Sequence, residues 1–172
     1  MARNRTKKKV ILDSTLQLIA EKGFHGMSMG ELAKHAAISP GTVYVYYKSK
    51  NELIIDLFNI IRHEMEEAIL DGYSADEDIQ SKFTILVTNL TEYYLKNKFA
   101  FLFMEQFYLS PFMEHVYDGF SGKVVECFKE VYLVGIRESI FKNLPLELMT
   151  SLIYGPVTSL VRKHHSGLFN IS

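Results

Sequence analysis

Cysteine, proline and tryptophan are scarce in this sequence of 172 residues, which has one cysteine, four prolines and no tryptophan. The single Cys127 cannot form a disulfide within the chain, which favours a reducing compartment. Long hydrophobic runs are also missing, because no stretch of about eighteen apolar residues is free of charge. The basic N-terminus meets only three apolar residues before Asp13, too few for a secretory signal. These absences predict a cytoplasmic protein that has no membrane span and no membrane partner.

Patterns that carry catalysis or bind metals are missing as well. The sequence has no glycine-rich phosphate loop, no nucleophile elbow, no Cys/His ligand set and no paired carboxylates in a credible context. Adjacent His164 and His165 would point about 100° apart on a helix, which suits a surface role better than a shared metal ion. Cys127 lies in an apolar helical segment, which favours a buried thiol over a redox sensor. We therefore expect no enzyme activity, no catalytic residue, no metal site and no cofactor.

The net charge of −1 conceals an uneven distribution. Residues 1–50 hold nine Lys and Arg against three acidic residues, a net of +6, whereas the remainder of the chain nets −7. A positive front joined to a negative back indicates that only the front meets a polyanion. Charge alone leaves open the simpler interpretation that the front is an ordinary solvated basic tail.

Helix is predicted along nearly the whole chain, because prolines are few and no clean strand alternation occurs. Apolar residues such as Ile11, Leu18 and Ile19 recur at helical spacing, and Gly23 and Gly72 supply stop signals. The sequence therefore predicts an all-α fold. The expected helices cover about residues 5–22, 28–37, 40–47, 49–71, 77–96, 99–109, 111–118, 121–142 and 145–165.

Three serines carry N-cap signals for the helices that follow them. Ser28 and Ser49 each stand three residues before a glutamate, which is the spacing of a capping box. Ser39 precedes Pro40, and proline is tolerated at the first helical position because its missing N–H would have no partner there. These caps define two short helices and the start of a long one.

The segment 23–53 has the size and order of a helix-turn-helix. A turn at residues 37–39 separates the two short helices, and the second helix turns Val43 and Tyr47 inward. Its other faces carry a mixture of side chains that is unusual for a bare surface but suited to packing on DNA. They are Pro40, Gly41, Thr42, Tyr44, Val45, Tyr46 and Lys48. A small helical subdomain with a tyrosine-rich surface is the alternative interpretation.

These side chains have separate physical tasks in a DNA contact. Gly41 allows the backbone to approach closely, while Thr42 and Tyr44 offer hydroxyls to phosphate oxygens. Val45 suits a thymine methyl group, and Tyr46 offers contact area or a hydroxyl to a base edge. The second short helix is therefore expected to carry both positioning and sequence-reading contacts.

Two further residues flank this pair of helices. Lys50, in the first turn of the next helix, adds a positive charge beside N–H groups that already favour anions. Ser28 has a similar place at the start of the first short helix. Both are expected to contact DNA phosphates.

The residues that carry this interpretation also resemble a known signature. The matching positions are Ile11-Leu12, Gly23-Phe24, Ser28, Glu31-Leu32-Ala33, Ala36-Ala37-Ile38-Ser39, Gly41-Thr42-Val43-Tyr44, Tyr47 and Lys50-Asn51-Glu52-Leu53. Over about residues 8–58 their order and spacing resemble the N-terminal signature of the TetR family of bacterial transcriptional regulators. Two departures are mild: Val43 stands where leucine is commoner, and Ala37 replaces a glycine that is common in the turn.

The resemblance implies a DNA-binding head at residues 1–50 and a larger helical domain for ligand binding and dimerisation at residues 51–172. It implies a ligand-responsive regulator that binds operator double-stranded DNA, by family habit a repressor. The implied phosphate contacts are Ser28, Tyr44 and Lys50. The implied contact to either phosphate or base is Thr42. The positions implied to lie near the bases are Gly41, Val45 and Tyr46.

Aromatic residues concentrate in the second part of the chain, where 17 of the 22 Phe and Tyr follow Gly72. A cavity among them would take a small, mostly apolar or aromatic ligand, because no cluster of Arg or Lys is there to pair a buried charge. The expected lining residues are Leu90, Tyr94, Phe103, Phe107, Phe128, Tyr132 and Tyr154. A regulator or architectural DNA-binding protein without a small-molecule ligand is the alternative.

A homodimer is expected through the last long helix, Leu144 to His165. The residues expected on its packing face are small or apolar: Leu148, Leu152, Gly155, Ser159 and Val161. Members of the family commonly end in two helices that pack in the dimer. This chain ends soon after the first of them, so we expect that either the last helix is lacking or the chain is a truncated form.

Overall fold

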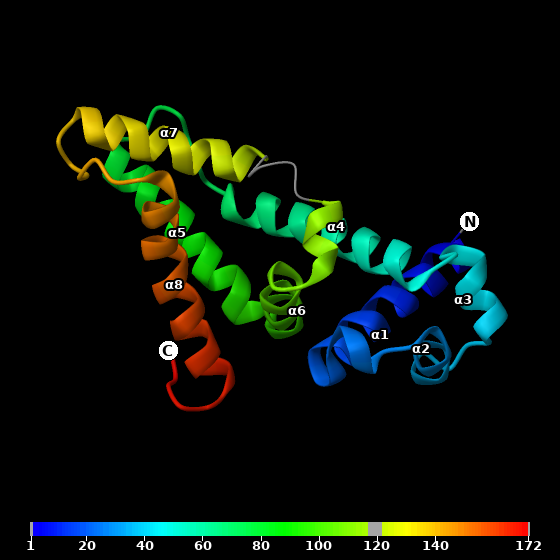
Figure 1. Cartoon of the computed structure of the whole chain (residues 1–172). Helices are drawn as coiled ribbons and strands as arrows, with labels where there is room; N and C mark the ends of the chain where they lie inside the picture. The colour runs from blue at the N-terminus through cyan, green and yellow to red at the C-terminus, as the bar shows by residue number, and fades with distance from the viewer. Residues whose placement is uncertain (1, 117–121, 172) are drawn as a thin grey trace. The chain divides into compact units, whose positions relative to one another are not determined.

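The computed structural model describes residues 2–116 and 122–171, with side chains from residue 7 onward (Figure 1). Within these residues the chain forms helices and no strand, which confirms the predicted all-α fold. None of the described helices is both long enough and apolar enough to cross a bilayer. In chain order the elements are α1 (Ala2–Gly26), α2 (Met29–His35), α3 (Pro40–Tyr46), α4 (Lys50–Ile69), α5 (Ile79–Lys96), α6 (Lys98–Tyr108), the 3-10 helix η1 (Pro111–His115), α7 (Lys123–Arg137) and α8 (Leu146–His165).

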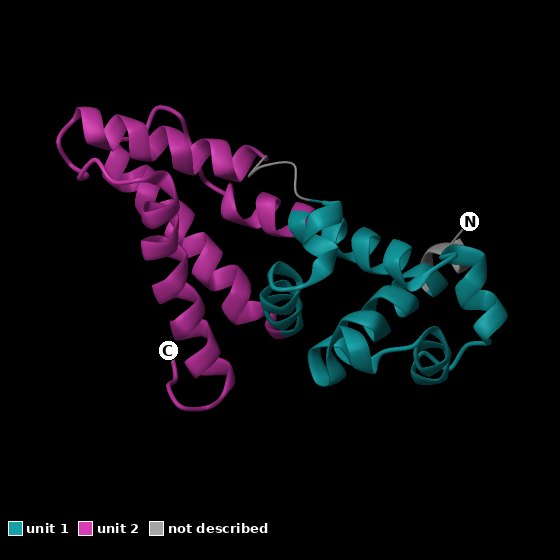
Figure 2. Cartoon of the chain, in the orientation of Figure 1, with its two compact units in different colours: residues 1–62, 99–117 teal, residues 63–98, 118–172 magenta. Residues whose placement is uncertain are grey.

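Packing divides the chain into two compact units (Figure 2). The head unit consists of residues 1–62 and 99–117, and the body unit consists of residues 63–98 and 118–172. The boundary falls inside α4, so α6 and η1 belong to the head unit although they come late in the chain. Because these units are defined by packing and not by function, the predicted domain limit after residue 50 stays a prediction.

The predicted N-caps begin the three helices that follow α1. The Ser28 hydroxyl accepts from the Glu31 N–H at 3.1 Å, and the Glu31 carboxylate accepts from the Ser28 N–H at 3.0 Å, a complete capping box. The Ser39 hydroxyl accepts from the Thr42 N–H at 3.2 Å, and Pro40 fills the first position of α3. The serine before α4 makes the same bond. These bonds satisfy N–H groups that a helix start leaves without an internal partner.

Gly23 interrupts the helical backbone of α1 where the sequence predicted a stop. Its φ is 72° and its ψ is 174°, and a second, short helical stretch follows this kink to Gly26. Glycine adopts a positive φ at no steric cost, and a Cβ at this position would lie 3.3 Å from the Gln106 Oε1. The Gln106 amide also donates to the Ile19 carbonyl at 3.1 Å. The kink therefore lies directly against α6 within the head unit.

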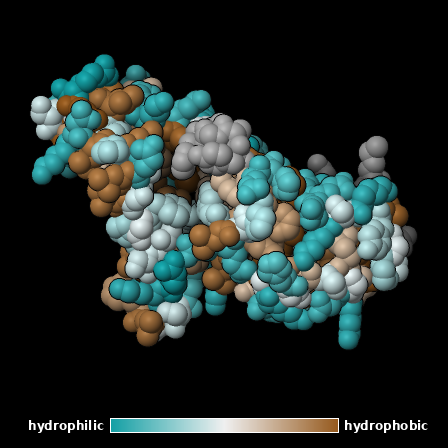
Figure 3. All heavy atoms as spheres, viewed as in Figure 1, coloured by the Kyte–Doolittle hydropathy of each residue, from teal (hydrophilic) through white to brown (hydrophobic). Residues whose placement is uncertain are grey.

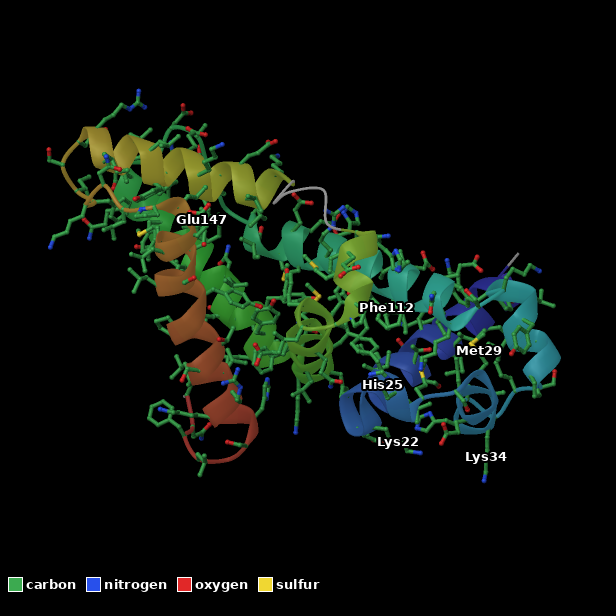
Figure 4. All side chains as sticks on the ribbon, viewed as in Figure 1. Lys22, His25, Met29, Lys34, Phe112 and Glu147 are labelled. Atoms are coloured by element: carbon green, nitrogen blue, oxygen red, sulfur yellow. The ribbon has the colours of Figure 1, made fainter. Side chains whose placement is uncertain are left out.

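The helix expected over residues 111–118 is the shorter 3-10 helix η1, and its last expected residues lie outside the described part of the chain. Pro111, at its start, has no N–H and cannot continue α6. The Phe112 side chain projects from η1 (Figure 4), and its ring centroid lies 5.2 Å from that of Phe24. The short helix thus packs against the end of α1 within the head unit.

The helix expected over residues 121–142 ends earlier, at Arg137. Beyond it Ser139 takes a left-handed conformation with φ of 59°. The Tyr132 hydroxyl then bridges the turn, accepting from the Leu144 N–H at 2.8 Å and donating to the Leu144 carbonyl at 2.6 Å. The predicted end of this helix at residue 142 is therefore too late, because the backbone turns at Ser139 and the Tyr132 side chain bonds to the segment that follows.

Aromatic rings form the core of the head unit. Phe107 stacks on Phe58 with centroids 4.1 Å apart and lies 5.6 Å from Phe103. Phe24 meets Phe103 edge to face at 5.7 Å. Together with Phe112 these residues make an aromatic cluster that joins α1, α4, α6 and η1. Helix α6 is therefore part of the hydrophobic core on which the helix-turn-helix rests.

Helix α5 packs against both α7 and α8 in the body unit. Leu90 of α5, Val131 of α7 and Val161 of α8 are all buried. The Glu66 carboxylate, near the end of α4, accepts from the Val124 N–H at 3.2 Å in the first turn of α7. An anion at this place satisfies a helix N-terminus that has no cap of its own.

Candidate nucleic-acid interface

Helices α2 and α3 pack on each other, and α1 packs on α2. The chain turns between them at Ala37, whose φ is 53°. The Ile38 N–H donates to the Ala33 carbonyl at 3.0 Å and closes the end of α2. A left-handed conformation costs an alanine about 1–2 kcal/mol. The turn keeps this conformation because the helices on both sides are fixed by their caps and their packing.

Helix α3 buries one side and exposes the other, as the sequence predicted. Val43 is fully buried, and Tyr47, which caps the C-terminus of α3, is 3% exposed. Val45 is 73% exposed and Tyr44 is 47% exposed. Around Gly41 no atom lies within 4 Å of the place that a Cβ would take. An exposed apolar and aromatic surface on a helix of seven residues is suited to the major groove.

The other residues predicted on this face are also at the surface of the head unit. Pro40 is exposed, Tyr46 is half-buried, and the half-buried Thr42 shares a hydrogen bond of 2.9 Å with the N-cap serine. Lys48 is exposed, and its ammonium lies 3.4 Å from the backbone carbonyl one turn earlier. Ser28 is exposed while its hydroxyl serves the capping box. Four of these residues thus lie on or next to α3, whereas Ser28 begins α2, and their contacts with DNA stay a prediction.

Lys50 has a structural role that the sequence did not reveal. Its side chain is half-buried, and its ammonium donates to the backbone carbonyl of Phe24, just after the kink in α1. This bond holds the start of α4 to the end of α1. An ammonium has three N–H donors, so the expected phosphate contact can coexist with this bond and stays a prediction.

A polar cluster of Lys8, Tyr47 and Asp56 lies directly after α3. The Tyr47 hydroxyl donates to the Asp56 carboxylate at 2.6 Å, and the Lys8 ammonium lies 3.0 Å from the same carboxylate. The Lys8 ammonium also lies 5.7 Å from the centroid of the Tyr47 ring. Lys8 comes from α1 and Asp56 from α4, so the cluster joins both helices to the end of α3.

The protonation behaviour of the cluster follows from these contacts. Burial opposes ionisation of Asp56, but the bond from Tyr47 and the adjacent Lys8 ammonium outweigh it and hold the Asp56 pKa below its ordinary value. Burial first, and then the neighbouring carboxylate, raise the pKa of Tyr47. Near neutral pH the cluster therefore contains a carboxylate, a neutral phenol and an ammonium ion.

Sequence reasoning did not single out Lys8 as a paired residue, and it missed Asp56. Asp56 stands nine residues after Tyr47 and on a different helix. No short motif links the two positions, and Lys8, which contacts both, comes from a third helix, α1. The one available signal was a tyrosine at a buried position, because a buried hydroxyl requires a polar partner.

The residues expected to line a ligand cavity belong to both units. Phe103 and Phe107 are fully buried in the head unit, inside the aromatic cluster. The other five belong to the body unit: Leu90, Tyr94, Phe128, Tyr132 and Tyr154. There the Tyr94 and Tyr154 hydroxyls lie 3.2 Å apart, whereas the Tyr132 hydroxyl is engaged in the turn after α7. The expected ligand contacts stay a prediction.

The expected dimer face of α8 is exposed in large part. Leu148 is 45% exposed, Leu152 is 55% exposed, and no atom lies within 4 Å of the place that a Cβ on Gly155 would take. Ser159 is half-buried, but Val161 is fully buried within the body unit and so cannot belong to that face. Figure 3 shows apolar side chains gathered on the surface of this unit. Large apolar side chains grouped on one helix are typical of a protein interface.

Comparison with known families matches both parts of the chain. Residues 11–57 match the family described as bacterial regulatory proteins, tetR family. Residues 57–171 match the family described as tetracyclin repressor-like, C-terminal domain, and this second match alone covers more than half of the chain.

Curated relatives align over the first part of the chain. The fatty acid metabolism regulator protein of Bacillus subtilis (strain 168) is 33% identical over 84 residues, which cover 49% of this chain and 40% of that protein. The HTH-type transcriptional regulator BetI of Klebsiella pneumoniae (strain 342) is 29% identical over 72 residues, which cover 42% of this chain and 37% of that protein. The aligned part of the chain thus spans about two fifths of the length of these relatives.

Solved structures are similar over nearly the whole chain. A TetR family transcription regulator from Marinobacter aquaeolei VT8 has a TM-score of 0.83 at 24% identity, covering 99% of this chain and 90% of that one. The transcriptional regulator FadR from Bacillus subtilis, in complex with stearoyl-CoA, has a TM-score of 0.71 at 17% identity, covering 95% and 89%. At these identities the likeness shows that the fold is shared.

Proposed function

Because the chain belongs to the TetR family of bacterial regulatory proteins, we propose that it is a ligand-responsive transcriptional regulator, a repressor that leaves its operator when a small molecule binds. The exposed outer face of α3, held on a buried inner side, is the observation that carries this proposal. A DNA-binding regulator requires no catalytic group. We place the protein in the bacterial cytoplasm, where its operator is.

The head unit supplies the proposed contacts with DNA. Val45 and Tyr46 would reach base edges or thymine methyl groups, and Tyr44 and Lys48 would reach phosphates. The net charge of +6 in residues 1–50 favours a polyanion on this side of the chain. Base contacts would give sequence preference, and phosphate contacts would give affinity and orientation.

The body unit supplies the proposed dimer contact. Two copies would pair through the exposed Leu148 and Leu152 of α8, burying well over about 1,000 Å² in total. A two-fold dimer carries two heads, which would enter successive major grooves with centres about 34 Å apart. Dimerisation therefore sets the spacing at which the operator is read.

The proposed ligand is small and mostly apolar or aromatic. The aromatic residues of the chain concentrate after Gly72, and the B. subtilis FadR structure holds stearoyl-CoA, a molecule with a long apolar chain. Binding would favour a conformation in which the heads no longer fit the groove spacing. A coupling free energy of about 1–3 kcal/mol between ligand and DNA is typical of such regulators.

Ligand-dependent release from DNA tests the proposal. The purified chain would first select fragments from a bacterial genome, and compounds that raise its melting temperature would then be added to the complex. We expect apolar or aromatic compounds to stabilise the protein and to release the selected fragment. Stabilisation only by sugar-like compounds, metal ions or anions without an apolar chain would exclude the apolar ligand but leave the regulator. Stable binding that no compound reverses would favour the alternative, an architectural or ligand-independent DNA-binding protein.

A further inference from the structure

The polar cluster of Lys8, Tyr47 and Asp56 lies where the chain leaves the recognition helix. Tyr47 has an extended backbone, with φ of −136° and ψ of 119°, and follows the strongly exposed Val45 by two residues. Its ring is buried while its hydroxyl donates to Asp56. The carboxylate of Asp56 is therefore fixed beside the residue that ends α3, the helix that the head unit would present to DNA.

Asp56 pairs with a lysine of the basic N-terminal segment. The Lys8 ammonium lies 3.0 Å from the Asp56 carboxylate, and their side chains are 46% and 35% exposed. Both charged groups thus remain partly exposed, and a DNA phosphate would have to compete with the Asp56 carboxylate for the Lys8 ammonium. The Tyr47 ring beneath the ammonium adds a second attraction that holds Lys8 in place.

The two lysines next to Lys8 on α1 differ from it because they form no ion pair within the described residues. Lys7 and Lys9 are exposed, and neither forms an ion pair with any residue that the structure describes. Their charges are available to a polyanion, whereas the charge of Lys8 is balanced by a carboxylate on α4. Of three consecutive lysines, the head unit neutralises the middle one.

We propose that Asp56 is a positioning residue that acts through Lys8: it withholds the Lys8 charge from DNA phosphates and so limits binding to nonspecific DNA. The inference rests on the proposed DNA-binding function. Nonspecific affinity depends on the number of phosphates that a protein neutralises, whereas base contacts from α3 depend on sequence. Withholding one charge in each head lowers this sequence-independent affinity and leaves the base contacts of α3 unchanged, so that base contacts supply a larger share of the affinity for an operator.

Asp56→Asn separates this role from a structural one. Asparagine keeps the size of the side chain and an oxygen that accepts from Tyr47, but it releases Lys8. The probe is a short fluorescein-labelled duplex of arbitrary sequence, titrated at salt concentrations between about 50 and 200 mM. We expect the slope of log affinity against log salt to steepen by about 0.9 for each head, which is a further loss of about 3.5-fold across that range. A variant with a merely damaged head would lose affinity at every salt concentration with no steeper slope.

Two further variants complete the test. Asp13 is exposed on α1 and forms no ion pair with the described residues, so Asp13→Asn makes the same change in net charge without releasing a lysine. We expect it to leave the slope near that of the wild type. Lys8→Gln alone should also leave the slope unchanged, and adding it to Asp56→Asn should restore the wild-type slope.

The outcomes distinguish this inference from the proposed function. An unchanged slope in Asp56→Asn, or an equal change in Asp13→Asn, overturns the role of Asp56. A shallower slope in Lys8→Gln alone shows that Lys8 already contacts phosphate and also overturns it. This last variant decides the matter if Asp56→Asn does not fold. If the wild type itself shows no salt-dependent binding to any duplex, the proposed DNA-binding function fails, and the inference fails with it.

Discussion

The head unit and the body unit expose apolar surface in different surroundings. In the head, Tyr44 and Val45 lie on a helix of seven residues, within the basic segment of residues 1–50. In the body, Leu148 and Leu152 stand on a helix of twenty residues in the acidic half. A narrow apolar face among positive charges suits a DNA groove, whereas a long face of leucines suits another copy of the chain. The surroundings of an exposed apolar residue thus indicate its partner better than its exposure does.

Helix α6 supports the head unit although it comes late in the chain. Phe107→Ala should lower the free energy of unfolding by about 3–5 kcal/mol, since the fully buried ring stacks on Phe58 at 4.1 Å and its loss leaves a cavity. Urea denaturation of the full chain measures the effect. As a control, Leu109→Ala at a 92% exposed site should change it by less than about 0.5 kcal/mol. A loss below about 1 kcal/mol for Phe107→Ala would show that α6 does not support the head.

A charged residue on the exposed face of α8 should disrupt the proposed dimer contact of the body unit. Leu152→Glu would place one unpaired carboxylate from each copy in the dimer contact. We expect the dissociation constant of the dimer to rise at least about 100-fold. Sedimentation over a range of protein concentrations measures it. Leu109→Glu makes the same chemical change in the head unit and should leave the dimer intact. Equal effects of the two variants would count against the assignment of the leucine face to a second copy.

The sequence predicted the fold and the recognition helix well, because both depend on local signals. N-cap serines, helical periodicity and the inward spacing of Val43 and Tyr47 act over a few residues, and the structure confirms each of them. These signals need no knowledge of what packs against the helix.

Features that depend on distant residues could not be predicted in this way. The segment after α7 is held by a bond from Tyr132 to Leu144, and the partner of Lys50 in the structure is a carbonyl on α1. The pairing of Lys8 with Asp56 joins a residue of α1 to a residue of α4. Each is a tertiary contact between positions that no spacing rule connects.

A substitution in the turn between α2 and α3 should stabilise the protein, by less than Phe107→Ala destabilises it. Ala37→Gly should raise the free energy of unfolding by about 0.5–1 kcal/mol, because glycine removes the strain of φ 53° but loses more entropy on folding. The adjacent Ala36, with φ of −75°, gives a matched control. Ala36→Gly should destabilise the head by about 0.5–1 kcal/mol. Thermal unfolding of both variants measures the difference, and destabilisation by Ala37→Gly would mean that the turn is not strained.

The smallest expected effect is the loss of the Asp56 contribution to stability at acidic pH. Because the Asp56 pKa lies below its ordinary value, its contribution to stability is present above the unfolded pKa of about 4 and is lost as the pH falls through the folded value. The melting temperature of the wild type should therefore exceed that of Asp56→Asn by a constant amount from pH 7 to about pH 5, and the gap should close below about pH 4. A gap that widened on acidification would contradict the ionised cluster.

Parallel selections with two variants of the exposed face of α3 show whether this helix reads DNA sequence. Val45→Ala should relax the preferred base at one or two operator positions, at a cost of about 1–3 kcal/mol for each position. Lys48→Ala should weaken binding to all sequences alike and keep the consensus. Recovery of one unchanged consensus with wild type and Val45→Ala, at equal affinity, would contradict the account.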